Sequence, residues 1–128
     1  MTAAYGRKAP IVTQRQTVKT ADYTVVVNTD SGKIFASALD GITYTLPAIA
    51  AGEVYTFINI GLDGAAAINI SPNASDGIMY VGSNTDDKDL INTKATAKRG
   101  DMVTLKSSEA GSVAWQVANA IGIWAKEA

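Results

Sequence analysis

Short β-type segments follow one another from residue 23 to about residue 124, several with hydrophobic and polar positions that alternate with a period of two, and turn-forming residues separate them about every ten positions. Ile42, Tyr44 and Leu46 alternate with threonines, as in a strand with one buried face, and Pro47 ends the ladder. Residues 53–60 are apolar on both faces, so we predict that they form the most central strand. Further strands are predicted at residues 23–28, 33–38, 66–70 and 78–81, with a short final strand at 121–125.

Short strands and tight turns predict an all-β fold class: an antiparallel sandwich or jelly-roll-like domain of about eight short strands, with a small barrel as the alternative. Residues 102–106 and 113–117 are expected to form a hairpin around residues 107–111. Residues 90–99 are ambiguous. Their Ala, Lys and Leu residues tolerate a helix, but the segment has two threonines and no apolar stripe.

The N-terminal segment differs from the rest, and we divide the chain into an extended basic arm, residues 1–20, and a single β domain, residues 21–128. Residues 1–21 carry four basic and no acidic residues, a charge of +4. The remainder carries 7 of the 11 basic and all 12 acidic residues, a charge of 7 − 12 = −5. The arm is interpreted either as a solubilising tail or as a segment that reaches an acidic neighbour. Residues 11–18 favour extended backbone and could add to the edge of another sheet.

A chain of 128 residues with 47% hydrophobic residues can fill one modest core. The apolar residues are mostly Ala, Val and Ile, and only 7% are aromatic, so we expect part of the stability to come from subunit contacts. The net charge of −1 argues against a nucleic-acid-binding function. No apolar run is long enough to cross a membrane, and no signal peptide is recognisable, so we expect the chain to stay in the cytoplasm where it is made.

Two residue types that are common in active sites are absent from the sequence. The chain has no Cys and no His, which rules out disulfides, thiolate metal sites and the commonest general base. No nucleophile elbow, phosphate-binding loop or dinucleotide fingerprint is present. We therefore predict that the protein is not an enzyme and has no catalytic residue, metal site or cofactor. Residues 86–89 lack EF-hand spacing and indicate a solvated acidic loop, and Arg99-Gly100-Asp101 is interpreted as a turn rather than an adhesive motif.

The aromatic residues of the body could in principle form a stacking platform for sugars or bases. Most lie on predicted strands, where an aromatic side chain usually packs in the core, and we favour that interpretation. The residues concerned are Tyr23, Tyr44, Tyr55, Tyr80, Trp115 and Trp124. Tyr5 differs because it lies in the arm, where a pocket on a partner is the natural place for its burial.

A series of turns and strands spanning about residues 23–124 carries a family resemblance. The series comprises Asp30-Ser31-Gly32-Lys33-x-Phe35, Ile42-x-Tyr44-x-Leu46-Pro47-Ala48, Gly52-x-x-Tyr55-x-Phe57-x-Asn59, Ile68-x-Ile70-x-Pro72, Asp76-Gly77-Ile78, Gly100-Asp101-x-Val103-x-Leu105, Trp115 and Gly122-x-Trp124. It resembles small structural proteins of tailed bacteriophages, most closely the head decoration (cement) proteins.

The resemblance implies a β-rich body that forms a homotrimer and binds the exterior of the capsid, where subunits of the major capsid protein meet. It implies a protein made in the host bacterial cytoplasm and located on the virion, with no nucleic-acid or membrane partner. Its terminal arms would reach neighbouring subunits, and we expect arm contacts from Tyr5, Arg7, Lys8, Ile11, Val12 and Arg15. The alternative is a tail-fibre or spike module that binds a host-surface glycan through exposed Trp115 or Trp124.

Overall fold

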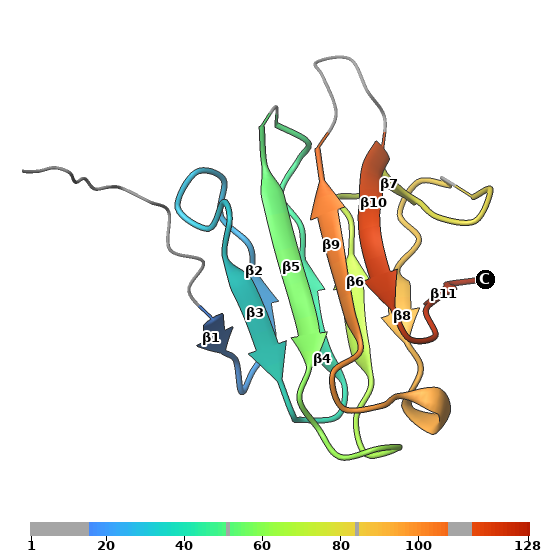
Figure 1. Ribbon diagram of the computed structural model, residues 1–128. Helices are drawn as coiled ribbons and strands as arrows, with labels where there is room; N and C mark the ends of the chain where they lie inside the picture. The colour runs from blue at the N-terminus through green and yellow to red at the C-terminus, as the bar shows by residue number, and fades with distance from the viewer. Residues whose placement is uncertain (1–15, 51, 84, 108–113) are drawn as a thin grey trace, which may run out of the picture.

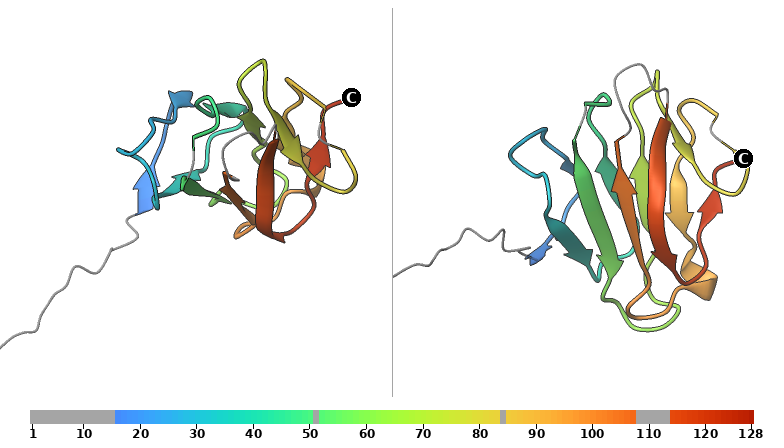
Figure 2. Two further views of the ribbon diagram at one scale, coloured as in Figure 1. Left: turned by 90° about the horizontal axis from the view of Figure 1, so that it is seen from above. Right: turned by 45° about the horizontal axis from the view of Figure 1, so that its top comes forward.

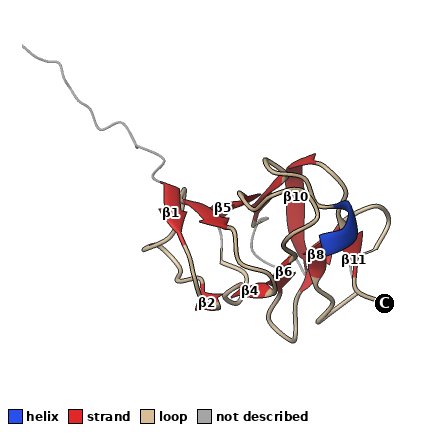
Figure 3. Cartoon of the chain, turned by 90° about the horizontal axis from the view of Figure 1, so that it is seen from below, coloured by secondary structure: helices blue, strands red, loops and turns tan. Residues whose placement is uncertain are grey.

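The computed structural model describes residues 16–50, 52–83, 85–107 and 114–128. Within these ranges the chain forms eleven short strands and one turn of 3-10 helix, η1 (Lys94–Thr96). The strands make two sheets that pack face to face (Figures 1 and 3). The prediction of an all-β sandwich is therefore confirmed, with more and shorter strands than expected.

The two sheets differ in width. The six-stranded sheet has the order β1 (Gln16–Val18), β3 (Ile34–Ser37), β5 (Val54–Asn59), β9 (Met102–Lys106), β10 (Ala114–Ile121), β7 (Gly77–Met79). The five-stranded sheet has the order β11 (Ala125–Lys126), β8 (Leu90–Asn92), β6 (Ile68–Ser71), β4 (Ile42–Thr45), β2 (Tyr23–Thr24).

From β1 to β6 the chain is wound as a flattened coil. Each successive strand lies in the opposite sheet, so β1, β3 and β5 are parallel neighbours in one sheet, and β2, β4 and β6 are parallel neighbours in the other. The later strands β8, β9 and β10 then add antiparallel to β6, β5 and β9 respectively.

The predicted antiparallel pairing is wrong for this coil. Five of the nine strand pairs among the described residues are parallel. The reason lies in the turns, such as Leu39-Asp40-Gly41, which carries the chain from β3 across to β4 in the facing sheet rather than back to a neighbour in the same sheet. A tight turn in the sequence does not distinguish these two routes.

Several predicted elements are found close to their expected positions. The segment 53–60 forms β5, which lies between β3 and β9 inside the larger sheet, and residues 102–106 pair with β10 as an antiparallel hairpin. Strand β10 continues to Ile121, so the final strand is only Ala125–Lys126. The ambiguous segment 90–99 forms β8 followed by η1, not an α-helix.

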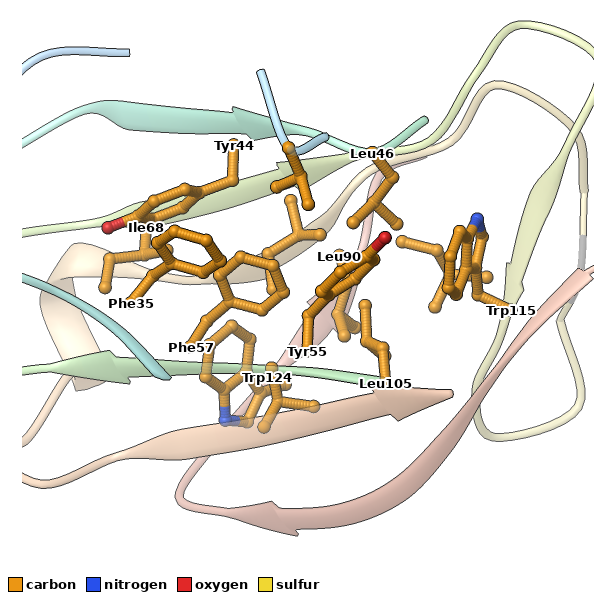
Figure 4. Close-up of a cluster of buried hydrophobic side chains, with 14 of the residues drawn as sticks. Phe35, Tyr44, Leu46, Tyr55, Phe57, Ile68, Leu90, Leu105, Trp115 and Trp124 are labelled. Atoms are coloured by element: carbon orange, nitrogen blue, oxygen red, sulfur yellow. The ribbon is translucent and has the colours of Figure 1, made fainter. Parts of the chain in front are cut away.

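The core between the sheets is built around aromatic side chains (Figure 4). Because β3 and β5 are parallel and in register, Phe35 and Phe57 are direct partners, and their rings stack with centroids 5.6 Å apart. Tyr44 packs against Phe57 from the facing sheet at 4.9 Å, and Tyr55 contacts Trp115 at 5.5 Å. The predicted core role of the body aromatics is confirmed: four are buried (Tyr44, Tyr55, Trp115 and Trp124), and Tyr23 and Tyr80 are half-buried against them.

Candidate interaction surface

The two ends of the sandwich are formed by different strand edges. Strands β1 and β2 lie at one end, and β7 and β11 at the other, where the C-terminus also lies (Figures 1 and 2). An unpaired strand edge presents free N–H and C=O groups that can pair with another chain. The state of each edge therefore indicates where the body can accept an added strand.

At the end that carries the C-terminus, the edge of β7 is covered. The Lys126 ammonium donates to the carbonyl oxygen of Ile78 in β7 at 2.6 Å, and a bridge between Gly77 and Asp86 covers the same strand. Burial lowers the pKa of Lys126, as expected for an ammonium turned inward to cap a strand. The Glu127 side chain accepts from Asp89 N at 3.0 Å and fixes β11 against the start of β8.

The opposite end is open along β1. Lys19 N donates to Ala36 O at 2.8 Å, so the backbone groups of Lys19 and Thr17 face β3. Because strand backbone groups alternate in direction, the N–H and C=O of Gln16 and Val18 face away from the sheet. Within the described ranges no strand pairs with that side of β1, and the Val18 side chain is 55% exposed.

A buried carboxylate holds the open end in shape. Asp30 is inaccessible to solvent and accepts from the Tyr23 hydroxyl at 2.7 Å, from Val26 N at 2.8 Å and from the Lys33 ammonium at 2.9 Å. Burial alone would raise the pKa of Asp30, but these donors outweigh it and hold that pKa below its ordinary value. The hydrogen bond from the Tyr23 hydroxyl to Asp30 raises the pKa of Tyr23 to about 12. The Tyr23 ring thus has a fixed position, with the Lys19 ammonium 3.7 Å from its centroid.

The six residues predicted from the sequence to make arm contacts lie outside the described residues: Tyr5, Arg7, Lys8, Ile11, Val12 and Arg15. The structure does define where this segment joins the body. The described chain begins at Gln16 in β1, which the sequence-based division had placed in the arm, and β1 is the open edge strand of the larger sheet. The predicted contact segment is therefore covalently attached to the open end of the sandwich.

One surface was not predicted from the sequence, namely the outer face of the six-stranded sheet. Strand register places an apolar row across it, formed by Val18, Ala36, Ile58, Met102 and Ile121, of which Ala36 is itself buried. The adjacent row is uncharged, and its centre is a hydroxyl pair in which Thr56 Oγ1 lies 2.9 Å from Thr104 Oγ1. The pattern of residues 53–60 could have indicated this surface. A strand that is apolar on both faces has an apolar outer face as well as a buried one.

The Arg99-Gly100-Asp101 tripeptide, which was considered as an adhesive motif, has its acidic residue inside the fold. Asp101 of the Arg99-Gly100-Asp101 tripeptide is buried and accepts from Lys98 N at 2.9 Å and from Asn92 Nδ2 at 3.1 Å. Within the described ranges we find no ligand-sized pocket and no group of three or more His, Cys, Asp or Glu residues placed to hold a metal ion. Among the same residues no helix is long and apolar enough to span a bilayer.

Comparison with known proteins gave no relative: no family model matches the sequence, and neither a curated protein nor a solved structure matches the chain at a significant level.

Proposed function

We propose that this protein is a non-enzymatic virion protein that binds and stabilises the outer surface of a tailed-phage capsid as a trimer, with N-terminal arms that reach neighbouring subunits. The observation that carries this proposal is the position of β1. The basic N-terminal segment joins the body at the open edge strand, whereas at the opposite end Lys126 and Asp86 cover the edge of β7.

Charge and geometry support the same role. The +4 charge of residues 1–21 suits an acidic neighbour, and the outward N–H and C=O groups of β1 suit an added strand. Ordering an arm costs about 1–2 kcal/mol per residue. Three copies held in one trimer offset that cost through avidity, so weak individual contacts sum to stable attachment.

The experiment uses purified protein, undecorated phage heads and sedimentation. Full-length protein should pellet with heads saturably and raise their disruption temperature. A variant lacking residues 2–15 keeps β1 intact, so it should fold with an unchanged circular dichroism spectrum and fail to pellet. A charge-reversed variant, Arg7→Glu with Lys8→Glu, should bind weakly, whereas the control Thr2→Glu with Thr13→Glu should bind better than that variant.

Two results would overturn different parts of the proposal. Failure of the full-length protein to bind heads would overturn the capsid role. Normal binding by the variant without residues 2–15 would leave the capsid role standing and overturn the role of the arm. The glycan-binding alternative has lost its main support, because Trp115 and Trp124 are buried in the core.

A further inference from the structure

A strained turn lies at the tip of the hairpin that follows β7. Tyr80 N donates to Ser83 O at 2.9 Å, and Ser83 N donates back to Tyr80 O at 3.1 Å. Between them, Val81 and Gly82 both have positive φ values, 48° and 81°. Two successive residues of this kind define a type I′ turn, which is normally built from Asn and Gly.

Gly82 suits this turn and Val81 does not. A β-branched side chain in the left-handed region brings its Cβ against the neighbouring backbone, so a valine there is a rare outlier. No burial compensates, because Val81 is 85% exposed and has the largest exposed fraction among the large hydrophobic residues described. Asparagine would form the same turn without loss of an internal contact. Because this backbone strain gives Val81 no contact within the protein, it indicates that the Val81 side chain contacts a partner.

Acidic residues lie at the base of this hairpin. Asp86 forms a bridge with Gly77, and Asp87 N donates to Asp76 O at 2.9 Å. The Asp76 carboxylate accepts from Ile49 N at 3.1 Å, whereas Asp86 and Asp87 are exposed. The matching chemistry, basic residues mixed with apolar ones, is found in this chain within residues 1–21, which carry +4 and include Ile11 and Val12. That segment joins the body at β1, whereas the hairpin projects from the opposite end (Figure 1).

We propose that the Val81 tip, with the carboxylates of Asp86 and Asp87, docks on the basic N-terminal segment of a second copy. The two surfaces lie at opposite ends of one body, so the contact is head-to-tail. A head-to-tail contact forms a closed ring when its rotation permits, and a trimer is one such ring. The inference rests on the trimer of the proposed function and identifies the residues that build it.

The first test measures self-association of the full-length protein by sedimentation velocity, without phage heads. Val81→Asn should weaken association by at least about tenfold. At concentrations where both proteins are monomeric, the same variant should melt about 3–5 °C higher, because the turn is relieved of strain. Val81→Gly should act in the same way on association. Leu62→Asn replaces another strongly exposed apolar residue and should change neither property.

The second test concerns charge. The double variant Asp86→Asn with Asp87→Asn should weaken association and reduce its dependence on salt. Asp63→Asn is the matched control, since Asp63 is an exposed carboxylate near Lys98, at 3.8 Å, and lies away from the hairpin.

The inference would be overturned if the wild-type protein stays monomeric, or if the Val81→Asn variant associates like wild type. It would also be overturned if the Val81→Asn variant stays trimeric but loses binding to heads. The last would make the tip a contact with the capsid. Conversely, association that depends on Val81 without any binding to heads would support the contact between copies and remove only the capsid role.

Discussion

Gly122 lies directly against the carboxylate of Asp101, at the point where the chain leaves β10. A Cβ atom added at residue 122 would lie 2.2 Å from both Cγ and Oδ1 of Asp101, and Gly122 has a φ of +95°. Asp101 is held in place by Asn92, whose amide also donates to Ile123 O at 3.1 Å and accepts from Asn59 at 2.8 Å. This buried polar network ties β5, β8 and β9 to the chain between β10 and β11.

Gly122→Ala should therefore destabilise the fold strongly. We expect a loss of about 3–4 kcal/mol in the free energy of unfolding, because the new methyl group must displace a buried carboxylate and break its hydrogen bonds. Gly64→Ala is the control, since Gly64 also has a positive φ but has open space around the added atom. Its expected loss is about 1 kcal/mol. Urea denaturation measures both, and equal losses would contradict the role of the Asp101 contact.

Asp30 should make stability depend on pH in the acid range. Its pKa lies below the ordinary value of 3.8 in the folded protein, so the folded chain binds fewer protons than the unfolded chain there. The stabilisation is complete above pH 3.8 and is lost as the pH falls through the lower, folded value.

Thermal melts of wild type and Asp30→Asn between neutral pH and pH 2 test this expectation. Asp30→Asn should cost about 2 kcal/mol at neutral pH, because it weakens three hydrogen bonds to a charged group. The difference between the two proteins should shrink on acidification. A constant difference across the range would show that the charge of Asp30 does not contribute.

Trp115→Ala should act on stability rather than on recognition. The side chain is fully buried and packs against Tyr55, so we expect a loss of about 3–5 kcal/mol. Val26→Ala, at a valine that is 46% exposed, should stay within about 0.5 kcal/mol of wild type. Calorimetry measures the loss of stability of each variant relative to wild type. A Trp115→Ala protein that melts like wild type would place this tryptophan outside the core.

Proline substitutions in β1 distinguish its two edges. The Thr17 N–H faces β3, so Thr17→Pro should remove a ladder hydrogen bond and cost about 1–3 kcal/mol. The Val18 N–H faces outward, so Val18→Pro should leave the fold nearly unchanged. If a partner strand adds to this edge, Val18→Pro should lose binding to phage heads while its melting temperature stays close to that of wild type. Unimpaired binding by this variant would exclude strand addition at β1.

The sequence predicted those features that depend on local pattern. Period-two alternation located β4, the apolar run at residues 53–60 located β5, and the strand positions of the aromatic residues indicated their burial in the core. The parallel coil was not predictable, because Leu39-Asp40-Gly41 looks the same whether the next strand lies beside β3 or across from it. Val81 was placed in a strand because β-branched residues favour strands, and only the fold shows that it occupies a turn.

The coil also makes the size of the body adjustable. Phe35 and Phe57 are register partners 22 residues apart, and the chain between them passes through β4 in the facing sheet, which completes one turn of the coil. Insertion of one more turn of comparable length between β4 and β5 would widen each sheet by one strand spacing, about 4.8 Å. The surfaces at the two ends would keep their structure and only move apart. A lineage could thus match the reach of this protein to a larger or smaller spacing of binding sites without redesigning either end.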